Sequence, residues 1–288
     1  MTGAQPVKKT RFGIPAAIGR NNLVLRIVSS LVMAPLAVVT AYVGGLAFLA
    51  FWLLAALAVL WEWQTLVCDH DRNSVLTVGA VALIGSSLLM AFDWAGTALA
   101  LTVLGIFGIA TLASRVRRAW CAAGLIYAAA LVFAPVMLRG DDAWGFAAIA
   151  FLFAIVWPTD IVAYFVGRAV GGPKLFPRVS PNKTWSGAIG GTLAGVLCGT
   201  LVASLFGIVN LAAIAGVGLG LSVVSQGGDL VESAIKRTFG AKDAGSLIPG
   251  HGGLMDRLDG FLAAVVAAAM LGVLHRGIGA PAHGLMVW

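Results

Sequence analysis

Residues 226–259 read QGGDLVESAIKRTFGAKDAGSLIPGHGGLMDRLD, and this polar stretch interrupts a chain that is otherwise strongly apolar. It contains five of the 12 acidic residues of the chain, together with a histidine and several basic residues. A segment with this density of charge is too costly to place in the hydrocarbon core of a bilayer, so it must face water or line a polar cavity. We therefore predict that residues 226–259 carry an active site at a membrane surface.

The composition places the whole chain among the integral membrane proteins. Of its 288 residues, 60% are hydrophobic and only 11% are charged, whereas soluble domains carry about 25% charged residues. The net charge of +7 would suggest a nucleic-acid ligand in a soluble protein. In a membrane protein, Lys and Arg are instead concentrated in the cytoplasmic loops. We therefore expect a membrane-lipid environment and no nucleic-acid partner.

The apolar segments predict an all-α fold with about nine transmembrane helices, because a spanning helix needs about 20 apolar residues. The pair Gly44-Gly45 predicts a tight turn between the first two spans. The second span and the short, glycine-rich eighth span carry the weakest signal. The candidate spans are residues 23–43, 46–63, 74–92, 95–113, 120–138, 144–166, 186–206, 209–225 and 260–276.

The basic residues predict the orientation of these spans. With the N-terminus in the cytoplasm and the C-terminus outside, 17 of the 19 Lys and Arg residues fall on the cytoplasmic side, and only Arg139 and Arg276 do not. This distribution follows the positive-inside rule and suits a multi-pass protein of the cell inner membrane. It also places both long polar loops, 167–185 and 226–259, in the cytoplasm, where they can meet each other and cytosolic nucleotides.

We expect three regions along the chain. Residues 1–22 are polar and basic and form a cytoplasmic tail, since the apolar segment that follows is a retained anchor rather than a cleaved signal. Residues 23–138 form a transmembrane scaffold and a possible dimer region. Residues 139–288 form the catalytic region with its two cytoplasmic loops.

The first polar cluster surrounds the loop 167–185. Asp160 and Tyr164 are four residues apart and so share a helix face just before the loop. The loop ends in SPNKTWS, residues 180–186, in which Thr184 or Ser186 would cap the following helix. A helix N-terminus with a lysine and hydroxyl groups nearby is suited to bind phosphate. An ordinary interfacial loop, with a Trp at the headgroup level and basic residues on the inside, explains the same residues about equally well.

The second cluster begins at Gln226 and predicts an amphipathic helix. Asp229, Glu232, Ser233 and Lys236 follow the spacing i, i+3, i+4, i+7, which forms one stripe of a helix. A solvated helix face is the usual explanation of such a stripe. It explains less well why Asp229 follows so directly after an apolar span.

The remainder of the stretch combines glycines with carboxylates. Successive glycines on either side of Lys242, Asp243 and His251 allow backbone N–H groups to approach an anion. Asp256 and Asp259 are three residues apart and would point the same way on a helix. Two such carboxylates need a positive partner, either Arg257 or a divalent cation. Oxygen ligands of this kind suit Mg²⁺, which binds one or two carboxylates together with substrate phosphates.

Carboxylates for a metal, basic residues for phosphates and glycine-rich turns are the groups that phosphoryl or nucleotidyl transfer requires. Neither a Walker-type loop nor a dinucleotide fingerprint is present. The residues therefore predict a metal-dependent membrane enzyme that acts on a phosphate-bearing lipid with a nucleotide or another phosphate co-substrate. The rival class is an ion-coupled transporter, which would place acids at mid-depth along several spans. The predicted spans lack such acids.

At this level of detail the sequence resembles a known family. Residues 233–259 follow the pattern SxxKRxxxxKDxGxxxPxHGGxxDRxD, which is the signature of the phosphatidate cytidylyltransferase family at every fixed position. Asp160, Tyr164, Gly167 and residues 180–185 also resemble that family, and Ser186-Gly187 is a minor departure. The first four spans match only in character.

The resemblance implies that CTP and phosphatidic acid are the substrates, and that CDP-diacylglycerol and diphosphate are the products. It also implies Mg²⁺, a second cation such as K⁺, a homodimer and an all-helical inner-membrane fold. A related lipid-phosphate nucleotidyltransferase or a lipid kinase with another acceptor is the nearest alternative. His251 would serve either in positioning or in the chemistry.

By matching position, the resemblance assigns each candidate site residue a role. The catalytic residues are Asp229, Lys236, Arg237, Asp256 and Arg257, and the metal ligands are Asp229, Asp256 and Asp259. The substrate-binding residues are Asp160, Tyr164, Ser180, Asn182, Lys183, Thr184, Ser233, Lys242, Asp243 and His251.

Overall fold

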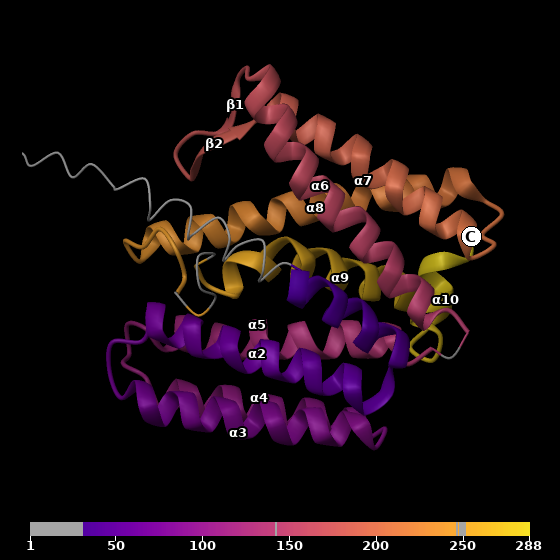
Figure 1. Ribbon diagram of the computed structural model, residues 1–288. Helices are drawn as coiled ribbons and strands as arrows, with labels where there is room; N and C mark the ends of the chain where they lie inside the picture. Colours follow the sequence, from indigo (N-terminus) through magenta and orange to yellow (C-terminus); the bar gives the residue numbers. More distant parts are fainter. Residues whose placement is uncertain (1–30, 142, 246, 248–251) are drawn as a thin grey trace, which may run out of the picture.

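The computed structural model describes residues 31–141, 143–245, 247 and 252–288, and within them nearly all regular structure is helical (Figure 1). Eight of these helices are long and apolar enough to cross a membrane, and the helix Leu31–Val43 is the described part of the first predicted span. The prediction of an all-α, multi-pass membrane protein is thus confirmed. The long helices are α2 (Gly45–Val67), α3 (Arg72–Ala91), α4 (Ala95–Leu112), α5 (Arg118–Arg139), α6 (Gly145–Val170), α7 (Trp185–Leu205), α8 (Leu211–Thr238) and α9 (Met255–Arg276).

The predicted turn at Gly44-Gly45 is confirmed. The helix Leu31–Val43 ends here and α2 begins at Gly45, and both glycines have positive φ angles, 70° and 53°. Residues with a Cβ atom rarely adopt this conformation, so the glycine pair allows the chain to reverse within two residues. Arg139, from the end of α5, donates hydrogen bonds from Nε to the Ala41 carbonyl at 2.5 Å and from Nη2 to the Tyr42 carbonyl at 3.1 Å.

The eighth predicted span, residues 209–225, is too short. The structure has one continuous helix, α8, from Leu211 to Thr238, in place of a short span followed by a separate amphipathic helix. Gly228 lies inside α8 and does not break it. At this position α8 approaches α9 closely, since a Cβ atom there would be 2.8 Å from the Asp259 carbonyl. A helix of this length extends about 42 Å, whereas the hydrocarbon core is about 30 Å thick. Its charged final turns therefore reach beyond the apolar part of the helix.

The two predicted polar loops also contain more regular structure than expected. In the loop 226–259, residues 226–238 belong to α8 and residues 255–259 belong to α9. In the loop 167–185, α6 continues to Val170, and an antiparallel hairpin of β1 (Lys174–Phe176) and β2 (Ser180–Thr184) follows. Strands of three and five residues are too short to show a recognisable alternation in the sequence. The short helix α10 (Pro281–Met286) was likewise not predicted.

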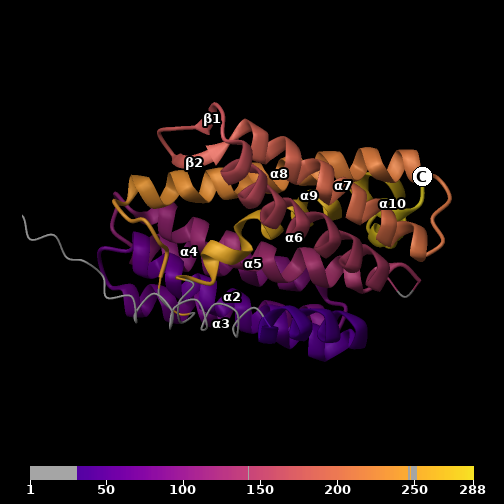
Figure 2. The ribbon, with the colours of Figure 1, turned by 45° about the horizontal axis from the view of Figure 1, so that its top comes forward.

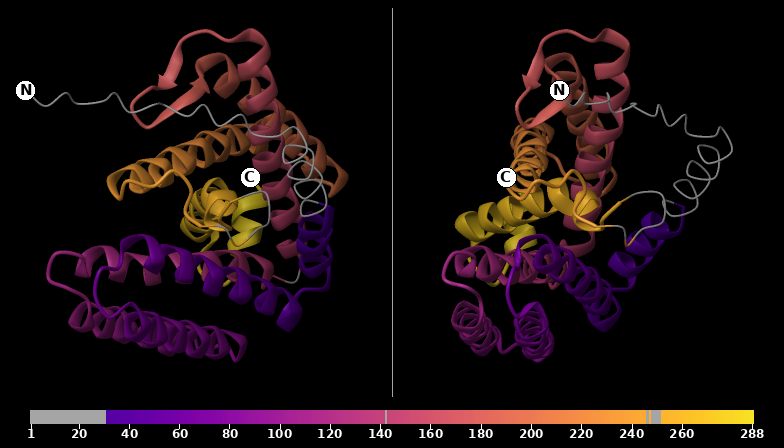
Figure 3. Two further views of the ribbon diagram at one scale, coloured as in Figure 1. Left: turned by 60° about the vertical axis from the view of Figure 1, so that its left-hand side comes forward. Right: turned by 90° about the vertical axis from the view of Figure 1, so that its left-hand side faces the viewer.

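Helix α9 lies at the centre of the molecule. Figures 1 and 3 show α9 between a group formed by α2 to α5 on one side and the longer helices α6 to α8 on the other. The ring of Phe261 in α9 stacks on Trp52 of α2 with a centroid distance of 4.9 Å, and lies 5.4 Å from the ring of Phe153 in α6. Because α9 begins with Asp256 and Asp259, its central position brings these acids close to elements from both halves of the chain.

Helices α6 and α7 pack closely along a row of glycines. Gly187, Gly191, Gly195 and Gly199 recur every four residues on α7 and are buried. Cβ atoms at the first three would lie 2.3–2.6 Å from the nearest atoms of α6, so larger side chains would separate the two helices. Small residues at this spacing let transmembrane helices approach closely. The hairpin that connects α6 to α7 is therefore held at a fixed position over one end of the bundle, beside the end of α8 (Figure 2).

The connections that we predicted to be cytoplasmic gather at one end of the bundle. Arg117, before α5, lies 3.9 Å from the Asp69 carboxylate and 4.7 Å from the centroid of the Phe239 ring, which follows α8. At the opposite end, Asp141 accepts a hydrogen bond from the backbone N–H of His283 at 3.0 Å. The alternation of the helices thus brings the basic connections together. Which end faces the cytoplasm stays a prediction, and residues 1–22 lie outside the described residues.

Candidate active site

A polar cavity of about 860 Å³ lies between the hairpin, α6, the start of α7, the end of α8 and the start of α9. It brings together the two polar stretches that the sequence analysis singled out. Opposite charges are balanced around it: its acidic lining residues are Asp160, Asp229, Asp256 and Asp259, and its basic lining residues are Arg168, Lys174, Lys183 and Arg257. Such a lining can bind a polyanion and its counter-charges in one place.

An ion pair joins the two walls of this cavity. Lys183, in β2, contacts a carboxylate oxygen of Asp229, in α8. Both side chains keep part of their surface exposed, 28% for Lys183 and 30% for Asp229. The predicted site residues Tyr164, Asn182 and Thr184 line the same cavity. Residues that are far apart in the sequence therefore meet as predicted.

The N-terminus of α7 opens onto the cavity. Thr184 is its N-cap residue, and the hydroxyl of Thr184 accepts a hydrogen bond from the backbone N–H of Gly187 at 3.2 Å. This confirms Thr184 as the predicted cap. The Ser186 hydroxyl lies 3.0 Å from that of Thr184 and donates to the Gly171 carbonyl. Because Gly187 and Ala188 also line the cavity, the positive end of the α7 dipole contributes to its electrostatics.

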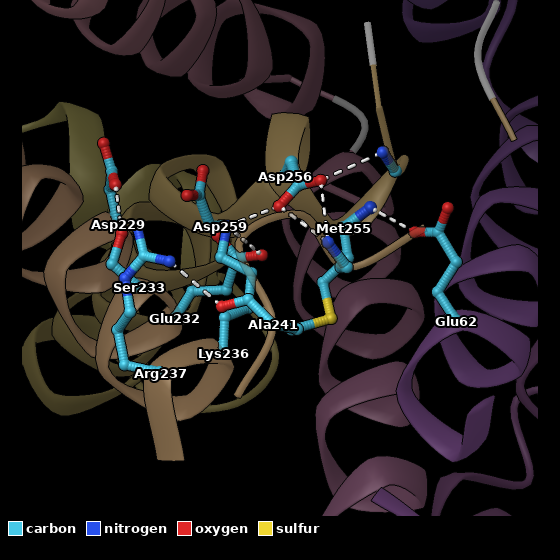
Figure 4. A network of polar contacts seen from close by, with 12 residues as sticks. Glu62, Asp229, Glu232, Ser233, Lys236, Arg237, Ala241, Met255, Asp256 and Asp259 are labelled. Carbon is cyan, nitrogen blue, oxygen red and sulfur yellow. Dashed lines mark hydrogen bonds and ion pairs between the residues drawn. The ribbon is translucent and has the colours of Figure 1, made fainter. Parts of the chain in front are cut away.

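The polar stripe of α8 is not a solvated face, and that interpretation is wrong. Glu232 and Lys236 are only 1% and 8% exposed. Lys236 Nζ lies 3.2 Å from Glu232 Oε1 and contacts the carboxylate of Asp256 (Figure 4). The lysine therefore neutralises two carboxylates that would otherwise be costly to bury. Lys236 was predicted to bind a substrate phosphate. In the structure it is not a lining residue of the cavity and binds carboxylates instead.

Asp256 is held at the N-terminus of α9 by backbone groups. Its carboxylate accepts hydrogen bonds from the backbone N–H of Gly253 at 2.9 Å and from that of Ala244 at 3.1 Å. Asp259 lies one turn later, and its Oδ1 accepts the backbone N–H of Gly260 at 2.7 Å. Both residues line the cavity, as expected for acids three positions apart on a helix.

Several predicted site residues lie away from the cavity in the part of the chain that the structure describes. Ser233 donates to Asp229 at 3.4 Å and is not a lining residue. The exposed Arg237 donates from Nη1 to the Ala241 carbonyl at 3.1 Å, where α8 ends (Figure 4). Lys242, Asp243 and Ser180 are not lining residues, and His251 lies outside the described residues.

The predicted site residues did not include four further candidates. Arg168, Lys174 and Gln226 line the cavity. Lys174 lies in the hairpin, whose strands gave no sequence signal, whereas Arg168 lies in the last turn of α6 and Gln226 lies in α8. The fourth is Glu62 of α2, which accepts hydrogen bonds from backbone groups at the start of α9. In the sequence, Glu62 stands out as an acid at the end of an apolar span, at a position compatible with the family resemblance.

A second, apolar cavity of about 370 Å³ adjoins the first. Its lining comes from the helix Leu31–Val43, α2, α6 and α9, and includes Phe51, Trp52 and Phe261. Asp160 and Arg257 line both cavities, so the two spaces meet at these residues. The region 23–138 thus helps to build the candidate site as well as the scaffold.

Within residues 31–141, 143–245, 247 and 252–288, no three His, Cys, Asp or Glu side chains gather closely enough to hold a metal ion by themselves. The donor set still fits Mg²⁺. Asp229, Asp256 and Asp259 offer only oxygen atoms to one cavity, and Mg²⁺ in nucleotide enzymes is bound by one or two carboxylates and completed by phosphates and water.

Residues 24–275 match the model of the cytidylyltransferase family. This chain belongs to the cytidylyltransferase family. It is 44% identical over 255 residues to the phosphatidate cytidylyltransferase of Brucella abortus, covering 88% of this chain and 94% of that protein. The proteins of that name from Bacillus subtilis and Staphylococcus aureus are 43% and 46% identical over 132 and 117 residues, which cover 44% and 40% of this chain and 48% and 44% of theirs. As a member of the family the chain is a nucleotidyltransferase enzyme, and the transporter hypothesis falls.

Proposed function

We propose that this enzyme transfers CMP from CTP to phosphatidic acid, which gives CDP-diacylglycerol and diphosphate. The observation that carries this proposal is the junction of a charged cavity with an apolar one at Asp160 and Arg257. A nucleotide needs the first kind of space, a diacyl lipid needs the second, and the reacting phosphates must meet between them. The Brucella abortus relative, whose alignment covers 88% of this chain, is a phosphatidate cytidylyltransferase.

The nucleotide phosphates belong in the polar cavity. Lys183, Arg168 and Lys174 supply positive charge there from the hairpin and the end of α6. The backbone N–H groups at the start of α7 add the dipole of a helix N-terminus, which favours phosphate. These groups withdraw charge from the triphosphate and orient its α-phosphorus.

The lipid belongs at the junction. Its acyl chains extend into the apolar cavity between the helix Leu31–Val43, α2, α6 and α9, and its phosphate lies near Arg257. Phosphatidic acid can then reach the site sideways from one leaflet, while CTP enters from the aqueous face. We infer that this face is the cytoplasmic one, in the cell inner membrane, because it collects the basic connections.

In the reaction, a phosphate oxygen of phosphatidic acid attacks the α-phosphorus of CTP. A P–O bond forms to the lipid, and the bond between the α-phosphorus and the bridging oxygen of the β-phosphate breaks. Diphosphate leaves with the electron pair. The lipid phosphate is already largely ionised near neutral pH, so the side chains serve mainly to bind, orient and neutralise charge.

We propose Mg²⁺ as the metal cofactor, with Asp229, Asp256 and Asp259 as the residues that would hold it. When bound, it would neutralise developing charge on the phosphates. In the structure, Lys183 and Lys236 balance the charges of Asp229 and Asp256. A second cation such as K⁺ and a homodimer rest on the family resemblance alone and stay predictions.

The test is a reconstituted assay with the purified full chain in detergent, labelled CTP, phosphatidic acid and Mg²⁺. We expect equal amounts of CDP-diacylglycerol and diphosphate. Diacylglycerol as acceptor and ATP as donor discriminate the alternatives, because a lipid kinase would release a nucleoside diphosphate instead. A panel of other lipid phosphates tests whether the acceptor differs. Absence of product above a blank across lipids and metal concentrations would refute the proposal.

A further inference from the structure

Glu62 is a fully buried acid in α2, far in sequence from the polar stretches. Its carboxylate oxygens accept hydrogen bonds from the backbone N–H groups of Leu254, at 3.0 Å, and Met255, at 2.8 Å. Figure 4 shows the contact between Glu62 and Met255. Leu254 is the N-cap residue of α9, and Met255 is its first helical residue. A carboxylate from the N-terminal half of the chain thus reaches into the segment that carries Asp256.

This contact supplies what α9 lacks at its own N-terminus. The first N–H groups of a helix have no partner within the helix, and the N-cap residue of α9, Leu254, has no side-chain cap. Glu62 accepts hydrogen bonds from the two N–H groups, and its negative charge is favoured by the helix dipole. Capping from a different helix ties the start of α9 to α2.

The loop before α9 is folded closely around the same carboxylate. A Cβ atom at Gly245 would lie 2.6 Å from Glu62 Oε1, and one at Gly253 would lie 2.8 Å from Glu62 Oε2. Contacts shorter than 3 Å would force the carboxylate or the backbone to move. The absence of side chains at these two positions is therefore what lets the loop pass so close to Glu62.

The other side of this segment is held by Asp256. Its carboxylate accepts the backbone N–H of Gly253 at 2.9 Å and that of Ala244 at 3.1 Å. The backbone from Gly253 to Asp256 is therefore held from one side by Glu62 and from the other by Asp256. Any displacement of Glu62 moves the N-terminus of α9 and with it the carboxylates that line the polar cavity.

We propose that Glu62 is a positioning residue, which fixes the backbone of residues 253–256 and so sets the direction of Asp256 toward the substrates. Glu62 lines neither of the two cavities described above, so it acts through Asp256 and not by contact with substrate. The inference rests on the proposed function, because Asp256 must act in that reaction for its position to matter.

The first test is Glu62→Gln, which keeps the size of the side chain and removes its charge. We expect kcat for CDP-diacylglycerol formation to fall about 10- to 100-fold, as for partners that orient catalytic ligands, while the KM for phosphatidic acid stays the same. Hydrogen exchange at the Leu254 and Met255 amides, followed on peptides by mass spectrometry, should become faster without any substrate present.

The matched control is Gln64→Leu. Gln64 lies two residues further along α2, is equally buried, and donates to the Cys121 carbonyl at 2.7 Å, away from α9. Its substitution should lower the thermal unfolding midpoint but leave kcat and the exchange of residues 254–255 unchanged. A similar loss of kcat in both variants would mean that Glu62 has only a structural role, and would overturn the proposal.

A second variant reaches the same contact from the loop. Gly253→Ala should reproduce the fall in kcat and the faster exchange, whereas Gly220→Ala in α8, where a Cβ atom meets nothing within 4 Å, should not. If Glu62→Gln does not fold, this pair decides. Wild-type kinetics in a folded Glu62→Gln or Gly253→Ala protein would refute the positioning role. An inactive wild-type protein would instead refute the proposed function. In that case, unchanged hydrogen exchange at Leu254 and Met255 in the Glu62→Gln variant would still count against the inference.

Discussion

Lys183 of the hairpin forms an ion pair with Asp229 of α8, and this contact connects the two polar stretches of the chain across the candidate active site. Both side chains line the cavity, so each is available to a substrate as well as to its partner. We propose that the phosphates of a bound nucleotide would replace the Asp229 carboxylate as the partner of Lys183, which would leave that carboxylate to a cation. The pair therefore links the two charges that nucleotidyl transfer needs.

Lys183→Ala should lower kcat/KM for CTP by about 100-fold, because it removes a cation placed to stabilise the transferring phosphates. Initial rates at varied CTP measure the effect. Arg178→Ala is the matched control, since Arg178 is an exposed residue of the same hairpin and lies outside the cavity lining. Equal losses in the two variants would indicate that the hairpin is disrupted and that Lys183 has no specific role.

Asp256→Asn should nearly abolish turnover, with a loss of at least about 1,000-fold, while the protein still folds. The amide keeps one oxygen for the backbone N–H groups but loses the charge that pairs with Lys236 and that suits Mg²⁺. Turnover is measured across a Mg²⁺ titration, with folding followed by size-exclusion chromatography. Asp93→Asn, on an exposed residue between α3 and α4 that lines neither cavity, serves as control. Persistent activity with unchanged Mg²⁺ dependence would exclude Asp256 as a ligand.

Lys236→Met should destabilise the fold by about 3–5 kcal/mol, because it leaves two buried carboxylates without their positive partner. The side chains of Lys236 and Asp256 are each only 10% exposed, and that of Glu232 is 1% exposed. Adding Glu232→Gln should recover part of the lost stability, since one of the uncompensated charges is then removed. Thermal unfolding of the single and double variants measures this. If the double variant is no more stable than Lys236→Met, the burial of charge is not the cause.

Ala55→Phe should raise the KM for long-chain phosphatidic acid and leave the KM for CTP unchanged. Ala55 of α2 lines the apolar cavity, and a phenyl group would fill part of its volume. With a short-chain, soluble phosphatidic acid, the KM of the Ala55→Phe variant should equal that of the wild type. Ala50→Phe, at an exposed position of the same helix, should behave like the wild type. An equal effect on long and short chains would argue against an acyl site in this cavity.

The sidedness can be tested with single cysteines in a variant that lacks Cys68, Cys121 and Cys198. Arg178→Cys in the hairpin should be protected from a membrane-impermeant thiol reagent in intact cells and should react after lysis. Val209→Cys, which lies between α7 and α8 and is 94% exposed, should react in intact cells. The reverse pattern would place the candidate active site outside the cytoplasm.

The sequence alone determined the class of the protein and the identity of most of the site. Apolar segments of about 20 residues have few options other than spanning helices, so eight of the nine predicted spans and their order followed from composition. Charges that lipid excludes had to gather where water or a cavity exists. The residues 180–185 and 226–259 were therefore recognisable before any contact was known.

Only the tertiary structure decided which of these residues face the cavity and which neutralise one another. Lys236 and Arg237 are adjacent in the sequence, yet one is buried between Glu232 and Asp256 and the other is exposed at the end of α8. The role of Glu62 depends on the crossing of α2 and α9, which are separated by more than 180 residues. Such contacts are invisible in a local pattern, because the direction of a side chain is set by the packing of the helix that carries it and not by its sequence neighbours.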